Sequence, residues 1–236
     1  MNFRFSILVI LSTANILSAQ PNYNDWDKFL KKYVSDSGDV DYTAIKANKA
    51  ELTKIINIFE RSKPDKTWNK NEQLAFWINA YNVFAIQLIT DNYPLKSIRD
   101  LDGGKTWDVK RIKIGSKMYS LNNIENDIIR PEFKDARIHF AVNCATKSCP
   151  PLLNAAFIPK TLDVQLDNQT KKFINHKKYQ RISSSEIKLS KIMDWYAVDF
   201  GNVINFINKY SNTKIKPNIK IAYLEYDWQL NDSKLK

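Results

Sequence analysis

The chain has 236 residues, of which 44% are apolar and 12% aromatic, so it can bury the core of a folded protein and is not intrinsically disordered. Its two cysteines and two histidines exclude a multi-disulfide scaffold and an array of zinc fingers. Lys and Arg outnumber Asp and Glu by 36 to 25, which gives a net charge of +11. These basic residues are spread along the chain without a nucleic-acid-binding signature, so we expect a Lys-rich surface and no specific nucleic-acid partner.

Residues 1–19 have the features of a secretory signal peptide. Arg4 supplies a positive charge, residues 5–11 form an apolar run, and small residues offer a cleavage point after Ala19. The run is too short for a permanent anchor, and no later segment reaches 18 consecutive apolar residues, so we expect no membrane span. We therefore predict export to the periplasm or the extracellular space, with residues 20–236 forming one domain. A buried first helix is the alternative for the apolar run.

The predicted elements, in chain order, are mostly helices. Apolar spacing, capping residues and breaks place helices over 22–34, 42–58, 69–91, 121–129, 150–156, 162–175 and 194–210, the last with a break near Gly201. Strands are predicted as a hairpin of 111–114 and 117–120, a single strand over 137–142, a pair within 181–189 and a last strand over 220–226. This order predicts an α+β fold, mostly helical, with a small antiparallel sheet.

The helix predicted over residues 69–91 is apolar almost all round, which is typical of a buried helix. At 100° per residue, Glu72, Asn79 and Asn82 fall in one stripe. A polar group that is buried without a partner costs about 1–3 kcal/mol, so these side chains must bond to something. They either line a site or form a structural hydrogen-bond network, and Glu72 could also lie in water at the start of the helix.

The segment from His139 to Leu152 is the part of the sequence most suggestive of chemistry. Pro150 suits the first position of a helix, which would make Cys149 the N-cap and would lower the pKa of its thiol. If residues 137–142 form a straight strand, Cys144 lies about 16 Å along the chain from His139, at roughly 3.3 Å per residue. The pattern therefore favours Cys149 as the nucleophile, with His139 as its base and Glu72 as the carboxylate that orients the imidazole.

Other roles for the two thiols stay open at this point. Export would place Cys144 and Cys149 in an oxidising compartment, where they could form a disulfide. They could also be inert residues of the core. A zinc site formed by both thiols and His139 lacks a fourth ligand, so we expect no metal and no cofactor.

Several of these segments occur together in a known family. They are Glu72 to Asn82, Ile124-Glu125, His139 to Cys144 with Ser148 to Leu152, and a C-terminal group comprising Leu189-Ser190, Trp195-Tyr196, Asp199-Phe200, Tyr226 to Trp228 and Leu230-Asn231. In this combination, from about Trp26 to Asn231, the chain resembles the domain-of-unknown-function family 547. The resemblance implies an exported bacterial protein, and it carries no settled reaction.

The resemblance also implies a site of the cysteine-hydrolase kind, because the Glu, His and Cys positions shared in the family match Glu72, His139 and either Cys144 or Cys149. Glu125 is another candidate carboxylate. Members of the family often have His directly after that Glu, where this chain has Asn126, which puts a role for a second imidazole in doubt.

Two hypotheses follow. The first is a thiol hydrolase or acyl transferase that acts on an amide or thioester bond, in which Asn79 or Asn82 polarises the substrate carbonyl and Asn143 and Glu125 contribute further substrate contacts. The second is a non-catalytic binding or scaffolding module with a Cys144–Cys149 disulfide. The ligand of this module would be a peptide, a glycan or a partner protein, whereas the substrate of the enzyme would be a peptide, a glycan or a small molecule.

Overall fold

The computed structural model describes residues 20–62, 64–183 and 186–235, so the predicted signal peptide over 1–19 lies outside the described residues. The fold is α+β and mostly helical, as predicted. Its α-helices are α1 (Asn24–Tyr33), α2 (Tyr42–Ala47), α3 (Lys49–Arg61), α4 (Lys70–Asn92), α5 (Arg130–Phe133), α6 (Leu162–Ile174), α7 (Ile192–Trp195), α8 (Ala197–Phe200) and α9 (Val203–Tyr210). Short 3₁₀ and π-helical segments are η1 (Ile98–Asp100), η2 (Asp102–Gly104), η3 (Thr106–Asp108), η4 (Asn123–Ile129) and η5 (Ala136–Phe140).

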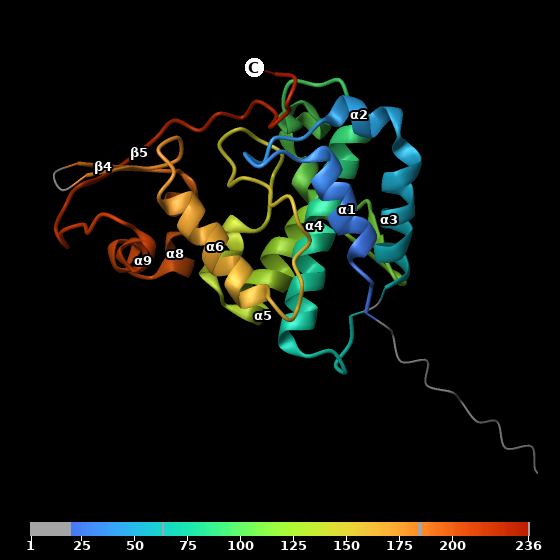
Figure 1. The fold of residues 1–236 in the computed structure, drawn as a ribbon, viewed down its shortest axis with the longest axis horizontal. Coiled ribbons are helices and arrows are strands. Elements are labelled where there is room, and N and C mark those ends of the chain that lie inside the picture. Colours follow the sequence, from blue (N-terminus) through green and yellow to red (C-terminus); the bar gives the residue numbers. More distant parts are fainter. Residues whose placement is uncertain (1–19, 63, 184–185, 236) are drawn as a thin grey trace, which may run out of the picture.

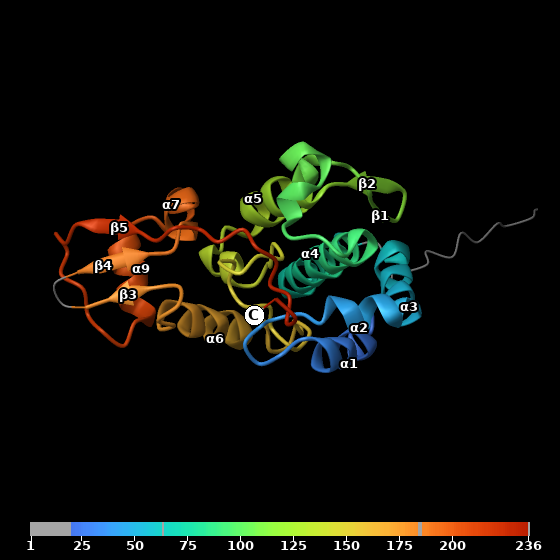
Figure 2. The same cartoon turned by 90° about the horizontal axis from the view of Figure 1, so that it is seen from above.

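The α4 helix is the central element of the fold (Figure 1). It begins with a reciprocal capping box, in which the Asn69 side chain accepts from the Glu72 N–H and the Glu72 carboxylate accepts from the Asn69 N–H. Nearly every residue from Leu74 to Thr90 is buried, as the all-round apolar pattern predicts. Figure 2 shows the reason, because α4 lies between α1–α3 on one side and α5 with the β1–β2 hairpin on the other.

The strands form two small sheets. The predicted hairpin is present as β1 (Ile112–Ile114) and β2 (Lys117–Tyr119), joined by a turn in which Gly115 has a φ of +59°. The second sheet has the order β3-β4-β5, from β3 (Arg181–Ile182), β4 (Ile187–Leu189) and β5 (Ile221–Tyr223). The β3–β4 pair is antiparallel, but β5 runs parallel to β4, with Ile187 opposite Ile221. The prediction of a purely antiparallel sheet is wrong at this edge, because three helices separate β4 from β5 along the chain.

Two predicted elements around the cysteines are wrong. Residues 137–142 do not form a strand, since Ala136–Phe140 is the 3₁₀ segment η5, which is capped by the Asp135 side chain. Residues 150–156 do not form a helix. Pro150 precedes a second proline, which disfavours helical backbone at that position. The carbonyls of both prolines accept side-chain bonds, from Asn143 Nδ2 (2.8 Å) and Gln169 Nε2 (3.0 Å).

The core consists of two adjoining clusters of buried side chains. The larger cluster surrounds α4, and the smaller one lies between α6, α9 and the β3-β4-β5 sheet. Figures 1 and 2 both show the chain after β5 running back from the sheet to the helical part. This return segment is held by bonds such as Ser97 Oγ to the Trp228 carbonyl (2.7 Å) and the Leu230 N–H to the Lys96 carbonyl (3.0 Å). This path places Tyr226 and Trp228 beside residues from the middle of the sequence.

Within the described ranges, none of the helices is both long enough and apolar enough to cross a membrane.

Candidate functional site

Cys144 lies in the wall of a pocket of about 230 Å³. The pocket is formed where α4, η3, η4, the turn after η5, α7 and the return segment meet. Its lining residues are Tyr81, Trp107, Asp108, Asn122, Glu125, Cys144, Ile192, Trp195, Tyr196, Tyr226 and Trp228. A thiol, a carboxylic acid and several aromatic rings therefore share one pocket, although their residues are spread over most of the chain.

The two cysteines are free thiols that touch each other. Cys144 Sγ lies 2.7 Å from Cys149 Sγ, and the Cys144 N–H donates to Cys149 Sγ at 2.9 Å. Cys144 is half-buried and lines the pocket, whereas Cys149 is buried behind it. The structure therefore corrects the preference for Cys149 as the pocket thiol, because that preference assumed a straight strand before Cys144 and a helix after Cys149.

The surroundings favour the thiolate on Cys144. The hydrogen bond from the Cys149 thiol lowers the pKa of Cys144, and contacts to Tyr226 Oη (3.2 Å) and Thr146 Oγ1 (3.5 Å) act in the same direction. Burial raises the pKa of Cys149 well above its usual value. Of the two sulfurs, Cys144 is therefore the one that more readily becomes a thiolate.

Glu125 supplies the acid of the pocket. It lies in η4, where the Arg130 N–H donates to the Glu125 carbonyl in the wide pattern of a π-helix, a geometry common at functional sites. The side chain is buried, and burial raises the pKa of Glu125, although hydrogen bonds from Tyr196 and Tyr81 act in the opposite direction. The predicted helix over 121–129 is thus present in a modified form, and it continues through Pro131 to Phe133.

His139 is buried behind Glu125 and does not touch either sulfur. Its ring stacks on Tyr196 with centroids 3.9 Å apart, and its Nε2 lies 2.7 Å from Asp199 Oδ2. Its Nδ1 lies 3.9 Å from Glu125 Oε1 and has no hydrogen-bond partner among the described residues. Burial lowers the pKa of His139 to about 4, so the imidazole is neutral at pH 7. The described contacts do not include the predicted His139–thiol pair, because η5 directs the imidazole toward Asp199 and Glu125.

Asp199, not Glu72, orients this imidazole. Burial alone would raise the pKa of Asp199, but hydrogen bonds from Arg130 and His139 outweigh it and lower that pKa. Arg130 reaches Asp199 with Nε (2.6 Å) and Nη2 (3.0 Å). Glu72 lies at the start of α4 in its capping box, so the structure does not bring it to the imidazole as predicted. The sequence analysis missed Asp199 as a site residue, although Asp199-Phe200 was among the segments shared with the family.

The asparagines predicted to contact substrate instead hold the backbone around the pocket. Asn79 Oδ1 accepts from Trp26 Nε1 (3.1 Å) and the Phe157 N–H (3.0 Å), and its Nδ2 donates to the Phe157 carbonyl (2.8 Å). Asn82 bonds the Ala141 carbonyl and the Asn143 N–H. The Asn143 side chain bonds the Ala145 N–H and the Pro150 carbonyl. These amides bond mainly to backbone groups of the protein, and their role in polarising a substrate carbonyl stays a prediction.

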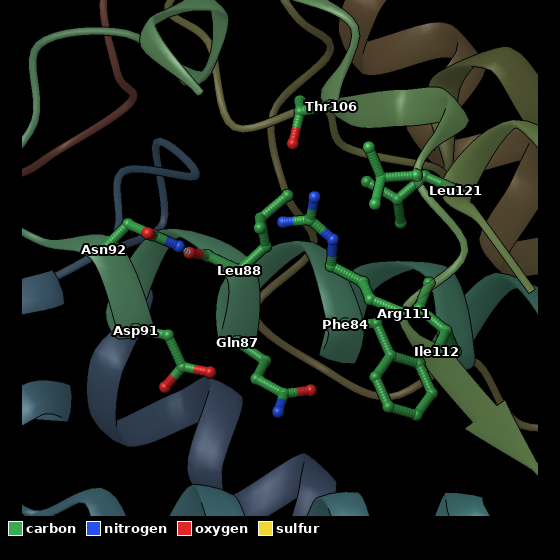
Figure 3. Close-up of a pocket in the computed structure, with 10 residues that line it drawn as sticks. Phe84, Gln87, Leu88, Asp91, Asn92, Thr106, Arg111, Ile112 and Leu121 are labelled. Carbon is green, nitrogen blue, oxygen red and sulfur yellow. Dashed lines mark hydrogen bonds between the residues drawn. The ribbon is translucent and has the colours of Figure 1, made fainter. Parts of the chain in front are cut away.

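A second pocket, of about 260 Å³, lies between α4 and the β1 region (Figure 3). The Arg111 guanidinium extends over α4 toward Leu88, and the Thr106 hydroxyl points the same way. Arg111 is paired with Asp102 at 2.5 Å. The described residues that line this pocket include neither cysteine nor histidine, so the Cys144 pocket is the better candidate for chemistry. Among the residues with described placement, no cluster of His, Cys, Asp and Glu could hold a metal ion.

The fold and the pocket thus define a mostly helical α+β protein with a thiol and a carboxylic acid in one aromatic pocket. Residues 66–174 match the family described as "Protein of unknown function, DUF547". This match confirms the resemblance seen in the sequence, since residues 66–174 are similar to the DUF547 family. The matched residues include Glu125, Cys144 and Cys149, but not Asp199 or Tyr226. No curated protein and no solved structure matches the chain significantly.

Proposed function

We propose that this protein is an exported thiol hydrolase or acyl transferase in which Cys144 is the nucleophile and Glu125 is the general acid and base. The observation that carries the proposal is that both side chains line one pocket while their surroundings move their pKa values toward each other. These shifts favour a thiolate on Cys144 and a protonated carboxyl group on Glu125, which is the pairing that acyl transfer needs.

The reaction starts from a Cys144 thiolate and a protonated Glu125. The sulfur attacks the carbonyl carbon of an amide or thioester, and the C=O electron pair moves to the oxygen. When that pair returns, the bond to the leaving group breaks, and the leaving amine or thiol takes the proton of Glu125. Water or an acceptor then attacks the Cys144 thioester and gives its proton to Glu125. The C–S bond breaks, and the thiolate and the protonated carboxyl group are both restored.

Other residues assist without reacting. The Tyr226 hydroxyl is 3.2 Å from Cys144 Sγ, where it can donate to the oxyanion that forms beside the sulfur. Cys149 stabilises the thiolate. His139 is a positioning residue, because its Asp199 bond fixes a neutral ring whose Nδ1 faces the Glu125 carboxyl group.

Thiol titration with mass spectrometry tests the nucleophile. Mature protein is treated with iodoacetamide across a pH series, and the label is located by peptide mapping. We expect Cys144 to be labelled at a lower pH than an ordinary cysteine and Cys149 to be labelled far more slowly. In a Cys149→Ala variant, the Cys144 profile should move to higher pH, because the thiolate has lost its hydrogen-bond donor. Faster labelling of Cys149 would overturn the assignment.

Turnover of a short-chain acyl thioester tests the reaction. Cys144→Ser should abolish it, and Glu125→Gln should reduce it by roughly 100-fold or more, the usual contribution of a general acid–base group. Glu132→Gln serves as a matched control on the neighbouring α5 helix, at an exposed position outside the pocket. Full activity in Cys144→Ser would contradict the proposal.

One observation favours the alternative of a binding module. Two sulfurs 2.7 Å apart in an exported protein are well placed to form a disulfide. Intact mass and thiol counting on protein secreted by cells, without added reductant, separate the two. A quantitative Cys144–Cys149 disulfide favours the binding module, whereas two titratable thiols favour the enzyme. N-terminal sequencing of the same material tests export and the cleavage site near Ala19.

A further inference from the structure

The charge of the Cys144 pocket is opposite to the charge of the protein. The chain has a net charge of +11. Nevertheless, the acidic residues Asp108 and Glu125 line the pocket, and neither Lys nor Arg occurs among its described lining residues. An anionic substrate would therefore find no cationic partner in this pocket, whereas a neutral or cationic one would meet no repulsion.

Aromatic rings form the mouth of the pocket. Trp195 stacks on Trp228 with centroids 5.7 Å apart and an interplanar angle of 27°. Tyr226 packs against both, at 4.8 Å from Trp195 and 4.5 Å from Trp228, and Trp107 meets Trp228 edge-on at 6.2 Å. Trp195 is 48% exposed, which is unusual for so large an apolar side chain. This aromatic mouth offers π-faces to a group that enters from solvent.

Two aromatic rings that line this pocket already make cation–π contacts with arginine side chains of the protein. The Arg99 guanidinium carbon lies 4.9 Å from the Trp228 ring centre, and that of Arg130 lies 5.0 Å from the Tyr196 ring centre. In the described part of the chain, no Lys or Arg occupies the face of Trp195 or Trp107 in this way. Asp108 is exposed beside Trp107, and its Oδ1 accepts from Asn122 Nδ2.

We propose that the substrate of this pocket carries a cationic group, of the alkylammonium kind found in a lysine side chain, which binds between the aromatic mouth and Asp108 while its acyl carbon faces Cys144. The inference rests on the proposed function for the position of the acyl carbon, but not for the binding of the cation. An ammonium group gains from the face of a Trp ring and from a nearby carboxylate, and an uncharged group of the same shape gains neither.

Calorimetric binding of two isosteric ligands tests this inference in the Cys144→Ser variant, which cannot turn either ligand over. The ligands are Nα-acetyl-lysine methylamide and its norleucine counterpart, in which a methyl group replaces the ammonium group. We expect the lysine ligand to bind about tenfold more tightly, and we expect raised salt to weaken this preference. Equal binding of the two ligands, or tighter binding of the norleucine ligand, would overturn the inference.

Matched variants locate the interaction. Asp108→Asn should reduce the preference for lysine to about twofold or less, and Trp195→Ala should weaken the binding of both ligands. Asp127→Asn removes the same charge from the neighbouring η4 at an exposed position that does not line the pocket, so it should leave the preference unchanged. Equal losses in the two Asp variants would mean that only the overall charge matters and would overturn the inference.

The same ligands as thioesters separate this inference from the proposed function. Lysine-selective binding without turnover by the wild-type protein would sustain the cation site and overturn the thiol chemistry. Turnover of both thioesters at equal efficiency would sustain the chemistry and overturn the cation site.

Discussion

Asn82 Oδ1 accepts a hydrogen bond from the Asn143 N–H at 2.8 Å, across 61 residues of chain. The same side chain donates from Nδ2 to the Ala141 carbonyl at 2.9 Å. One buried amide on α4 therefore satisfies both backbone groups of the turn that leads into Cys144. The position of the thiol depends on this amide, because the turn has no strand partner for these groups.

We expect Asn82→Ala to lower the free energy of unfolding by about 3 kcal/mol, because it leaves two buried backbone groups without partners. Asn92→Ala, at the exposed end of the same helix, loses a single bond to the Leu88 carbonyl and should cost less than about 1 kcal/mol. Urea denaturation measures both values. Equal losses in the two variants would contradict the role assigned to Asn82.

Gly38 is required where the chain passes the loop that carries Cys149. Its φ is +86°, and a Cβ atom placed there would lie 2.7 Å from the Leu152 nitrogen and 2.7 Å from Pro151 Cβ. We expect Gly38→Ala to lower the free energy of unfolding by about 3 kcal/mol or more, from backbone strain and overpacking together. Gly103 also has a positive φ, of +59°, but it has open space around it. Gly103→Ala should therefore lower the free energy of unfolding by only about 1–2 kcal/mol. Thermal unfolding of both variants measures the difference.

His139 should make the protein sensitive to acid. The pKa of its imidazole is about 4 in the folded protein, against 6.5 as its ordinary value. Between these two values the unfolded chain binds a proton that the folded protein does not, so stability falls as the pH drops from about 6.5 to 4, by about 3 kcal/mol for this residue. Above pH 6.5 the effect is absent.

The measurement is the free energy of unfolding against pH for the wild type and for His139→Gln, whose difference isolates this residue from Glu125. Burial raises the pKa of Glu125, so that side chain contributes with the opposite sign. His176→Gln removes the other histidine of the chain, which is exposed, and should change the slope little. A steep slope that survives in His139→Gln would refute the prediction.

Asp199 should contribute more to the free energy of unfolding than a carboxylate at the surface does. Asp199→Asn weakens charged bonds to both Arg130 and His139, so we expect a loss of about 2–3 kcal/mol in the free energy of unfolding at pH 7. Asp194→Asn removes the same charge from an exposed pair with Lys191 and should cost less than about 1 kcal/mol. Chemical denaturation measures the free energy of unfolding of both variants. Equal losses would contradict the stabilising role given to the bonds of Asp199.

Much of the helical architecture could be predicted from the sequence, because it depends on local signals. The α4 helix starts beside Asn69 and Gly201 separates α8 from α9, close to the predicted start and break, and the burial of α4 follows from its composition. The strand predicted over 137–142 and the helix predicted over 150–156 are both absent. Alternation of Ile138 and Phe140 suits a strand, but in the structure both side chains are buried from one 3₁₀ turn, in two different clusters of the core. No local pattern distinguishes these arrangements.

Composition, motifs and apolar periodicity are sufficient to identify the residue types available for chemistry, the resemblance to the family, and the buried central helix. Only the tertiary structure decided which groups meet. It placed Cys144 rather than Cys149 in the pocket, paired His139 with Asp199, and brought Tyr226 to the sulfur from 82 residues away. Such pairings depend on how the return segment and η5 cross α4. Between η5 and α6, the carbonyls of Ala141, Pro150 and Phe157 accept hydrogen bonds from Asn82, Asn143 and Asn79, and no periodicity along the chain signals these contacts.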